Sequence, residues 1–349
     1  MPTQAHGSPD RAWARRLVVT VALSGALAAG LPSASADEAA PTPAEPTVRC
    51  AITDERLAEL SGLVVVGEQT LALNDGGEQV AVYGLDGACQ VVDVQTAPVD
   101  PYDPEDLAVG RDGAVWLADT GDNGTQRPTV ALHVLRRGGA VALYRLSYPD
   151  GPHDAEALLV APDGTPYVVT KEVLGSSGVY RPAGALTDGA TVPLERVSTV
   201  NVTLTGTPGG PVGRAGQLMI TGGAVASDGS ALALRTYTDA YVWPLSGSDV
   251  VGALAAAPAR VALPESPQGE AVSFSADSRA LVVASEGLPS DVTLVPLPEG
   301  TAAPDPDPGS TAPVLADLAG DAPSLPAALL AALGAVILVW LGRRLLRRS

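Results

Sequence analysis

Acidic residues gather at both ends of one short segment, residues 104–123, which reads PEDLAVGRDGAVWLADTGDN. Two apolar runs flank a central Asp-Gly pair, which is typical of a hairpin turn. In an antiparallel hairpin the first strand starts beside the end of the second, so we expect Glu105 and Asp106 to lie near Asp119. Carboxylates in a confined place repel one another unless cations or protons neutralise them. The segment therefore predicts either a cation site or an internally salt-bridged acidic cluster.

The same pattern of a polar start, an apolar run, a turn, a second apolar run and a polar end returns along the chain. The other copies are residues 58–77, 154–172, 221–239 and 269–287. Their turns lie roughly 45–65 residues apart, which is the period of four-stranded β-propeller blades. The runs at 129–137 and 141–149 complete the second blade. We therefore predict an all-β propeller with five visible blades, and residues 194–216 leave room for a sixth.

The first strand of each propeller blade lines the central axis, so the charged groups at the hairpin ends converge at one mouth of the channel. Ligand sites commonly occupy such concave places. On this scheme Glu156 lies beside Lys171, and Glu270 lies beside Glu286. The predicted ligand-binding residues are Glu105, Asp106, Glu156, Lys171, Arg235, Glu270 and Glu286.

Calcium suits an acidic mouth because it takes several oxygen ligands. The run DTGDNG at 119–124 offers several oxygen donors on one loop, although it is not an EF-hand loop. The predicted metal ligands are Asp119, Asp122, Asn123, Glu105 and Glu156. A hydrated ring with internal salt bridges is the alternative, and the sequence leaves the two open.

Few residues are suited to other chemistry. The chain has three histidines, which is too few for a typical zinc site. His133 is expected to be an ordinary strand residue, whereas His153 lies near the mouth as a base, a ligand or a surface loop residue. The candidate catalytic residues are therefore His153, Lys171 and Arg235. The sequence contains neither a GxSxG elbow nor a Walker lysine motif, so serine esterase and P-loop chemistry are unsupported.

The two ends of the sequence indicate export and anchoring. Residues 1–36 combine early arginines, an apolar run and Ala34-Ser35-Ala36, which is typical of a signal peptide. Residues 325–342 are uncharged and are followed by the basic tail 343–349, which predicts one transmembrane helix with a cytoplasmic tail. Two Pro/Ala/Asp-rich segments then act as an N-terminal linker, 37–48, and as a stalk, 301–324, on either side of the propeller at 49–300.

Charge and cysteine usage support an extracellular domain. The formal net charge of −18 disfavours nucleic acid as a partner. Cys50 and Cys89 are the only cysteines, and in an oxidising compartment they are expected to form one disulfide. Residues 48–52 are expected to supply the outer strand of the last blade, and Cys89 to lie on the outer strand of the first. The disulfide would then join the two ends of the ring.

The segments ELSGL…NDGG, YDPEDLAVG…DTGDN, YPDGPHDAEALLV…TKE, ALRTYTDAYVW and QGEAVSF…SEG together resemble actinobacterial secreted propeller proteins. These are similar to the phytase-like propellers grouped as "esterase-like activity of phytase". The resemblance covers nearly all of residues 50–298 and implies a propeller with calcium. Propeller phytases bind phosphorylated substrates through several basic side chains and calcium, whereas this mouth offers only Lys171 and Arg235.

We therefore interpret the chain as a single-pass, cell-surface propeller that binds an extracellular ligand or partner at an acidic channel mouth, with calcium. The alternative is a metal-dependent phosphatase or esterase-like hydrolase. In that case Asp119, Asp122, Glu105 and Glu156 would hold the metals, and Lys171 and Arg235 would orient the anion.

Overall fold

The computed structural model describes residues 45–136, 138–298 and 301, and these form an almost purely β structure. In this part of the chain, twenty strands are joined by loops that contain the short helix α1 (Val250–Leu254) and the 3-10 turns η1 (Glu55–Leu57) and η2 (Gly213–Gln217). The strands group into five units of four, which we call blades 1 to 5.

Each blade is an antiparallel sheet, and its strands are named below in order from the innermost to the outermost. Blade 1 contains β2 (Leu60–Val66), β3 (Gln69–Asn74), β4 (Val80–Leu85) and β5 (Val91–Ala97). Blade 2 contains β6 (Pro104–Val109), β7 (Val115–Asp119), β8 (Val130–Leu135) and β9 (Val141–Ser147). Blade 3 contains β10 (Ala155–Val160), β11 (Pro166–Thr170), β12 (Ser176–Pro182) and β13 (Thr191–Asn201). Blade 4 contains β14 (Ile220–Val225), β15 (Ala231–Thr236), β16 (Asp239–Pro244) and β17 (Ala259–Ala262). Blade 5 contains β18 (Gly269–Phe274), β19 (Ala280–Ser285), β20 (Ser290–Pro296) and β1 (Thr47–Ile52).

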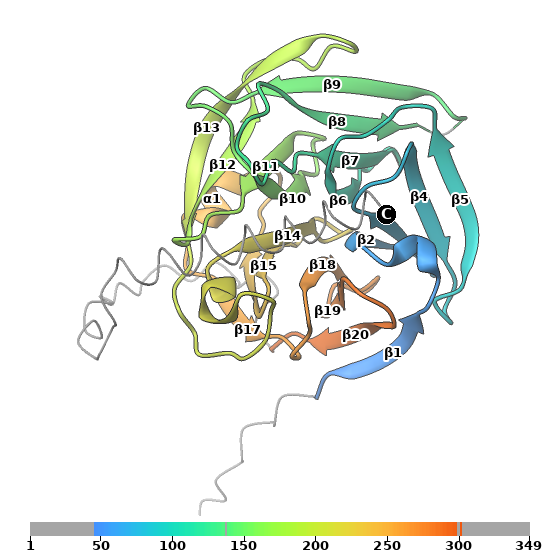
Figure 1. Cartoon of the computed structure of the whole chain (residues 1–349). Coiled ribbons are helices and arrows are strands. Elements are labelled where there is room, and N and C mark those ends of the chain that lie inside the picture. Colours follow the sequence, from blue (N-terminus) through green and yellow to red (C-terminus); the bar gives the residue numbers. More distant parts are fainter. Residues whose placement is uncertain (1–44, 137, 299–300, 302–349) are drawn as a thin grey trace, which may run out of the picture. The chain divides into compact units, whose positions relative to one another are not determined.

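The blades form a closed ring. Strand β2 contacts β6 and β18, β10 contacts β6 and β14, and β14 contacts β18, so the inner strands surround a common centre (Figure 1). The N-terminal strand β1 pairs with β20 and completes the last blade, as predicted. Blades 2 and 3 share one eight-stranded sheet because their outer strands β9 and β13 pair in parallel. The propeller prediction is confirmed at the level of this arrangement.

No sixth blade is present among the described residues. Residues 194–201 belong to the long outer strand β13, and the segment that follows is a loop containing η2. The long interval between the third and fourth hairpins thus comes from an extended outer strand and a loop rather than from a further blade.

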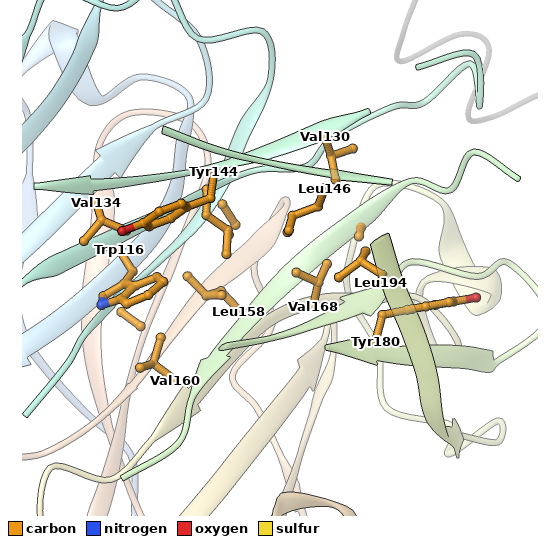
Figure 2. Packing of buried hydrophobic residues seen from close by; sticks show 14 of the residues in the cluster. Trp116, Val130, Val134, Tyr144, Leu146, Leu158, Val160, Val168, Tyr180 and Leu194 are labelled. Atoms are coloured by element: carbon orange, nitrogen blue, oxygen red, sulfur yellow. The ribbon is translucent and has the colours of Figure 1, made fainter. Parts of the chain in front are cut away.

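A separate apolar cluster fills each space between neighbouring blades. Between blades 2 and 3, for instance, Trp116 and Tyr144 face Leu158 and Val168 (Figure 2). Inner strands such as β10 and β18 are buried along their whole length because both of their faces lie against other blades. Burial of each large apolar side chain contributes about 1.5–3 kcal/mol, so these clusters hold the ring in register and fix its centre.

The predicted disulfide between Cys50 and Cys89 is confirmed, with 5.7 Å between the two Cα atoms. Cys50 lies on β1, as expected. Cys89 lies in the turn between β4 and β5 rather than on the outer strand, and its φ of 60° is typical of a tight turn. The bond joins the first blade to the last and covalently secures the closure.

Several predictions fall outside the described residues. These are the signal peptide at 1–36, most of the linker at 37–48, nearly all of the stalk at 301–324, the transmembrane helix at 325–342 and the tail at 343–349. Within the described part of the chain, no helix has the length and apolar character needed to cross a membrane.

Candidate functional site

Each inner strand carries a one-residue bulge at its start. In blade 2, for example, Pro104 pairs with Asp119 but Asp106 pairs with Ala118, so Glu105 is the extra residue. Register shifts occur at the corresponding places in β2, β10, β14 and β18. The equivalent residues around the ring are Ser61, Glu105, Glu156, Thr221 and Glu270, and all are buried.

Because of these bulges, the observed strand pairings differ by one residue from those expected from the sequence. The exit partner of Glu156 was predicted to be Lys171, whereas the pairing joins Ala155 to Thr170. In blade 4, Ile220 pairs with Thr236 but Gly222 pairs with Arg235, so Thr221 is the extra residue. A bulge inserts one unpaired residue and re-aims its side chain, and no local residue pattern revealed it.

Carboxylates from blades 1, 2 and 3 meet at the bulged end of the inner strands. Asp75, Asp103 and Glu105 each offer an oxygen within 4.8 Å of the others, and we call them the first carboxylate group. Glu105, Asp154 and Glu156 do the same and form the second carboxylate group. Glu105 belongs to both. Asp103 and Asp154 are partly exposed, so solvent reaches the edge of this otherwise buried cluster.

Glu105 lies at the centre of the cluster and lacks full hydrogen bonding. Its side chain is 1% exposed, and Oε1 has no hydrogen-bond partner among the described residues. The hydroxyl of Ser61 lies 3.2 Å from the other oxygen, Oε2. Burial raises the pKa of Glu105 well above its usual value, and the negative charges of Glu156, Asp75, Asp103 and Asp154 raise it further. A hard cation bound here would neutralise the cluster and supply the missing partner.

Asp106, the next residue, has a different environment. Its carboxylate accepts hydrogen bonds from the backbone N–H groups of Leu107 at 2.8 Å, Leu158 at 2.8 Å and Gly223 at 3.0 Å. These donors belong to blades 2, 3 and 4, so Asp106 ties three blades together across the axis. Burial still raises the pKa of Asp106 well above its usual range. Asp106 was predicted to bind ligand, but its oxygens are already used within the ring.

Asp119 also serves the scaffold. Arg127 Nη2 lies 2.9 Å from Oδ1, and His133 Nε2 lies 3.1 Å from Oδ2. The backbone N–H groups of Tyr102 and Asp103 each donate to it at 3.0 Å. Burial raises the pKa of Asp119, but the His133 contact, the charge of Arg127 and the two N–H donors outweigh burial and lower it to about 2. His133 is 2% exposed and is thus a packed strand residue.

The rest of the DTGDN run positions the neighbouring carboxylates. The N–H of Gly121 donates to the carbonyl of Asp103 at 3.0 Å, and the N–H of Asp122 donates to Asp154 Oδ1 at 2.8 Å. A Cβ on Gly121 would collide with the carboxylates of Glu105 and Asp103, so this position needs a glycine. The run therefore holds the first and second carboxylate groups in place.

Three predicted metal ligands accordingly lie outside both carboxylate groups. Asp119 is engaged as described, and the Asp122 carboxylate accepts the backbone N–H of Arg127 at 2.7 Å. Asn123 is partly exposed on the same loop. The other two predicted ligands, Glu105 and Glu156, are members of the groups.

Lys171 forms an ion pair with Glu156 Oε1, and its side chain is 7% exposed. Its Nζ also lies 5.5 Å from the centre of the Tyr237 ring. Burial would lower the pKa of Lys171, but the charge of Glu156, with smaller contributions from Tyr237 and Asp154, raises it well above its usual value. Lys171 is therefore charged and already paired.

Arg235 is 1% exposed and donates to backbone carbonyls of blades 4 and 5. Its Nη1 lies 2.9 Å from the carbonyl of Ala271, and its Nε lies 3.0 Å from that of Thr236. Burial lowers the pKa of Arg235 to about 10, against the opposing charge of Glu270. Arg235 also lines a cleft of ≈ 350 Å³ together with Glu286. Glu270 and Glu286 both accept a hydrogen bond from Gln268, on the blade 5 side of the mouth.

His153 lies on the loop that leads into β10 and contacts several polar neighbours. Its Nε2 lies 3.1 Å from Asp150 and 3.2 Å from the Tyr180 hydroxyl, and Nδ1 lies 3.5 Å from Glu172. The hydroxyl of Tyr180 donates to Asp150 at 2.8 Å. His153 thus belongs to a polar cluster on blade 3 and is in neither carboxylate group.

Sequence reasoning missed Asp75, Asp103 and Asp154 as cluster members. A signal for two of them exists, because Asp103 and Asp154 each precede a bulged glutamate by two residues, in the runs DPE and DAE. Asp75 follows the end of β3 in the run NDGG, at the position that Lys171 occupies after β11.

The chain matches no protein-family model and no curated protein. Among solved structures, it is similar to a gluconolactonase from Xanthomonas campestris, with 20% identity over 69% of this chain and 73% of that chain and a TM-score of 0.41. It is also similar to the PQQ-bound aldose sugar dehydrogenase from Streptomyces coelicolor, with 10% identity over 73% of this chain and 99% of that chain and a TM-score of 0.38. At these values no activity is transferred to the chain.

Proposed function

We propose that the chain is a cell-surface propeller that holds a calcium ion in the first carboxylate group, Asp75, Asp103 and Glu105, and binds an extracellular ligand there. The observation that carries this proposal is Oε1 of Glu105, a buried carboxylate oxygen that has no hydrogen-bond partner among the described residues and belongs to a side chain shared by both carboxylate groups. Buried acids that lack partners are destabilising, and a hard divalent ion relieves that cost.

The nature of the ligand follows from the coordination that calcium prefers. Calcium takes about 6–8 oxygen ligands, and three carboxylates that use one oxygen each supply only part of this set. The partly exposed edge at Asp103 leaves room for further oxygens from solvent or from a ligand. We infer a ligand with oxygen donors, such as carboxylates, phosphates or hydroxyls.

The proposed location rests on the signal-peptide pattern at 1–36 and the apolar run at 325–342 with its arginine tail. The disulfide between Cys50 and Cys89 supports export to an oxidising compartment.

The contacts of the cationic side chains do not favour the phytase-like hydrolase alternative. Lys171 is paired with Glu156, and Arg235 is buried against backbone carbonyls, so both groups proposed to orient an anion are already engaged.

The proposal is tested by thermal unfolding of the purified full chain with calcium and with a chelator. A ligand at 100 times its Kd stabilises by about 2.7 kcal/mol, which corresponds to a rise in Tm of roughly 5–10 °C for a domain of this size. Glu105→Gln should abolish the calcium-dependent rise. The control Asp163→Asn also removes one charge, in an exposed turn of blade 3, and should retain the calcium-dependent rise in Tm. An unchanged Tm of the wild type on adding calcium refutes the proposal.

A further inference from the structure

The second carboxylate group contains the same kind of ligands as the first, because it shares Glu105 and adds Asp154 and Glu156. Both groups offer three carboxylate oxygens within 4.8 Å of one another. On ligand type alone, each group would attract a divalent cation. The question is therefore what distinguishes the two.

Lys171 distinguishes them, because it reaches the second group. Its ammonium pairs with Oε1 of Glu156, and its backbone N–H donates to the carbonyl of Asp154 at 2.9 Å. The side chain of Lys171 is 7% exposed, and its Nζ lies 5.5 Å from the centre of the Tyr237 ring. The ammonium thus contacts Glu156, and the backbone of Lys171 is tied to the backbone of Asp154, a second member of the group.

Lys171 is also the only lysine in the 349-residue sequence. A lysine ammonium is a compact point charge that can stand where a small cation would otherwise bind. It carries one positive charge, offers no lone pair and already pairs with Oε1 of Glu156, a member of the second group. An ion entering the second group would have to displace a buried ion pair, and breaking such a pair is strongly unfavourable.

We propose that the ammonium of Lys171 fills the second carboxylate group in place of a metal, so that the chain binds one divalent ion and removal of the ammonium opens a second cation site. This inference rests on the proposed function, since it presupposes that the first carboxylate group binds calcium. It assigns Lys171 the role of a built-in cation that sets the number of ions.

The test is the number of calcium ions bound per chain, measured on the full chain by equilibrium dialysis with radioactive calcium at saturation. The wild type should bind one ion. Lys171→Met, which keeps an unbranched side chain one heavy atom shorter and removes the charge, should bind two. Lys171→Arg should bind one because it retains a cation. Arg145→Met, an exposed site on β9, matches the change in net charge and should leave one ion bound.

A second variant tests whether the new ion uses Glu156. In Lys171→Met/Glu156→Gln both members of the ion pair become neutral, so the chain should fold without calcium and bind one ion. Two ions bound to this variant would overturn the assignment, as would one ion bound to folded Lys171→Met or two bound to the wild type.

Folding of Lys171→Met provides an independent outcome. Because calcium would replace the lost ammonium, this variant should be stabilised by calcium more than the wild type is. Failure to fold even in millimolar calcium contradicts the proposal. If the wild type binds no ion, the proposed function itself fails, whereas one ion in both wild type and Lys171→Met refutes only the role of Lys171.

Discussion

Two of the buried carboxylates of blade 2, Asp119 and Glu105, have opposite surroundings. Asp119, at the end of β7, contacts Arg127 and His133 and accepts two backbone N–H groups, and its pKa falls to about 2. Glu105, on the adjacent strand β6, has other carboxylates as neighbours, and its pKa is raised well above the usual value. Their exposed fractions are nonetheless similar, 4% and 1%.

Asp119 is therefore a structural acid, whereas Glu105 requires a cation or a proton from solvent. A buried carboxylate whose hydrogen bonds and charge are satisfied stabilises the ring and has no capacity left for a ligand. A buried carboxylate among other acids destabilises the ring until a cation or a proton arrives. In the sequence the run DTGDN resembles a set of metal ligands, but its carboxylates are structural ones whose hydrogen bonds are satisfied.

Asp119→Ala should have the largest effect on stability. It leaves Arg127 and His133 without their carboxylate and removes the acceptor for the N–H groups of Tyr102 and Asp103. Breaking a buried ion pair from one side costs about 3–5 kcal/mol. The free energy of unfolding, measured by urea denaturation in a chelator, should fall by that amount. A loss below about 0.5 kcal/mol would be within the range of surface substitutions and would contradict a structural role.

Much of the fold was predictable because it depends on periodic patterns. The five hairpins repeat their turns and apolar runs, and the closing strand at 48–52 and the Cys50–Cys89 bond followed from the order of the strands. The long strand β13 was missed because residues 194–201 pair with β12 of the same blade and residues 191–193 pair with β9 of blade 2, and neither pairing leaves a local pattern.

The site was predictable only in part, for a related reason. Glu105 and Glu156 were placed correctly at one end of the inner strands, since every hairpin has the same polarity. The bulges that turn their side chains inward depend on backbone register, and the choice between Asp103 and Asp119 depends on which acid Arg127 and His133 reach. Arg127 and His133 lie 8 and 14 residues after Asp119, outside the DTGDN run, so the run itself does not reveal these contacts.

Gly121→Ala tests whether the DTGDN run positions the ligands. Its Cβ would collide with the carboxylates of Glu105 and Asp103, so the loop must shift. Overpacking of this kind costs about 1–3 kcal/mol, and the calcium-dependent rise in Tm should shrink. Gly124→Ala is the matched control in the same loop, because its Cβ would meet nothing closer than 3.7 Å. Equal behaviour of the two variants, by thermal unfolding with and without calcium, would contradict a positioning role.

Replacing each of the two acids by its amide should change the free energy of unfolding in opposite directions when calcium is removed by a chelator. Asp119→Asn weakens the pairs with Arg127 and His133 and lowers the free energy of unfolding. Glu105→Gln removes a charge from among like charges and should raise it, by about 0.5–2 kcal/mol as for other stabilising substitutions. Chemical denaturation of both variants at neutral pH gives the comparison. Destabilisation by Glu105→Gln in the absence of calcium would show that side chains of the protein itself already neutralise the carboxylates.

The smallest effect concerns the dependence of stability on pH. The pKa of Glu105 is raised above its ordinary value of 4.5 on folding, so its contribution to stability is present below that pH and is lost as the pH rises through the folded pKa. The pKa of Asp119 is lowered from 3.8 to about 2, so its contribution is present above 3.8 and is lost as the pH falls towards 2. In a chelator the free energy of unfolding should therefore decline on both sides of about pH 4.

Calcium should remove one of these two slopes and leave the other. A bound cation keeps Glu105 ionised in the folded state, so the decline above pH 4.5 should become shallower by up to about 1.4 kcal/mol per pH unit, the value for one proton. Asp106 also has a raised pKa and retains its part of the slope, because its partners are backbone N–H groups. Urea denaturation from pH 3 to 7, with calcium and with a chelator, separates the contributions. Glu105→Gln in a chelator should reproduce the shallower slope, and identical slopes in calcium and chelator for the wild type would mean that no metal ion displaces the proton of Glu105 into solvent.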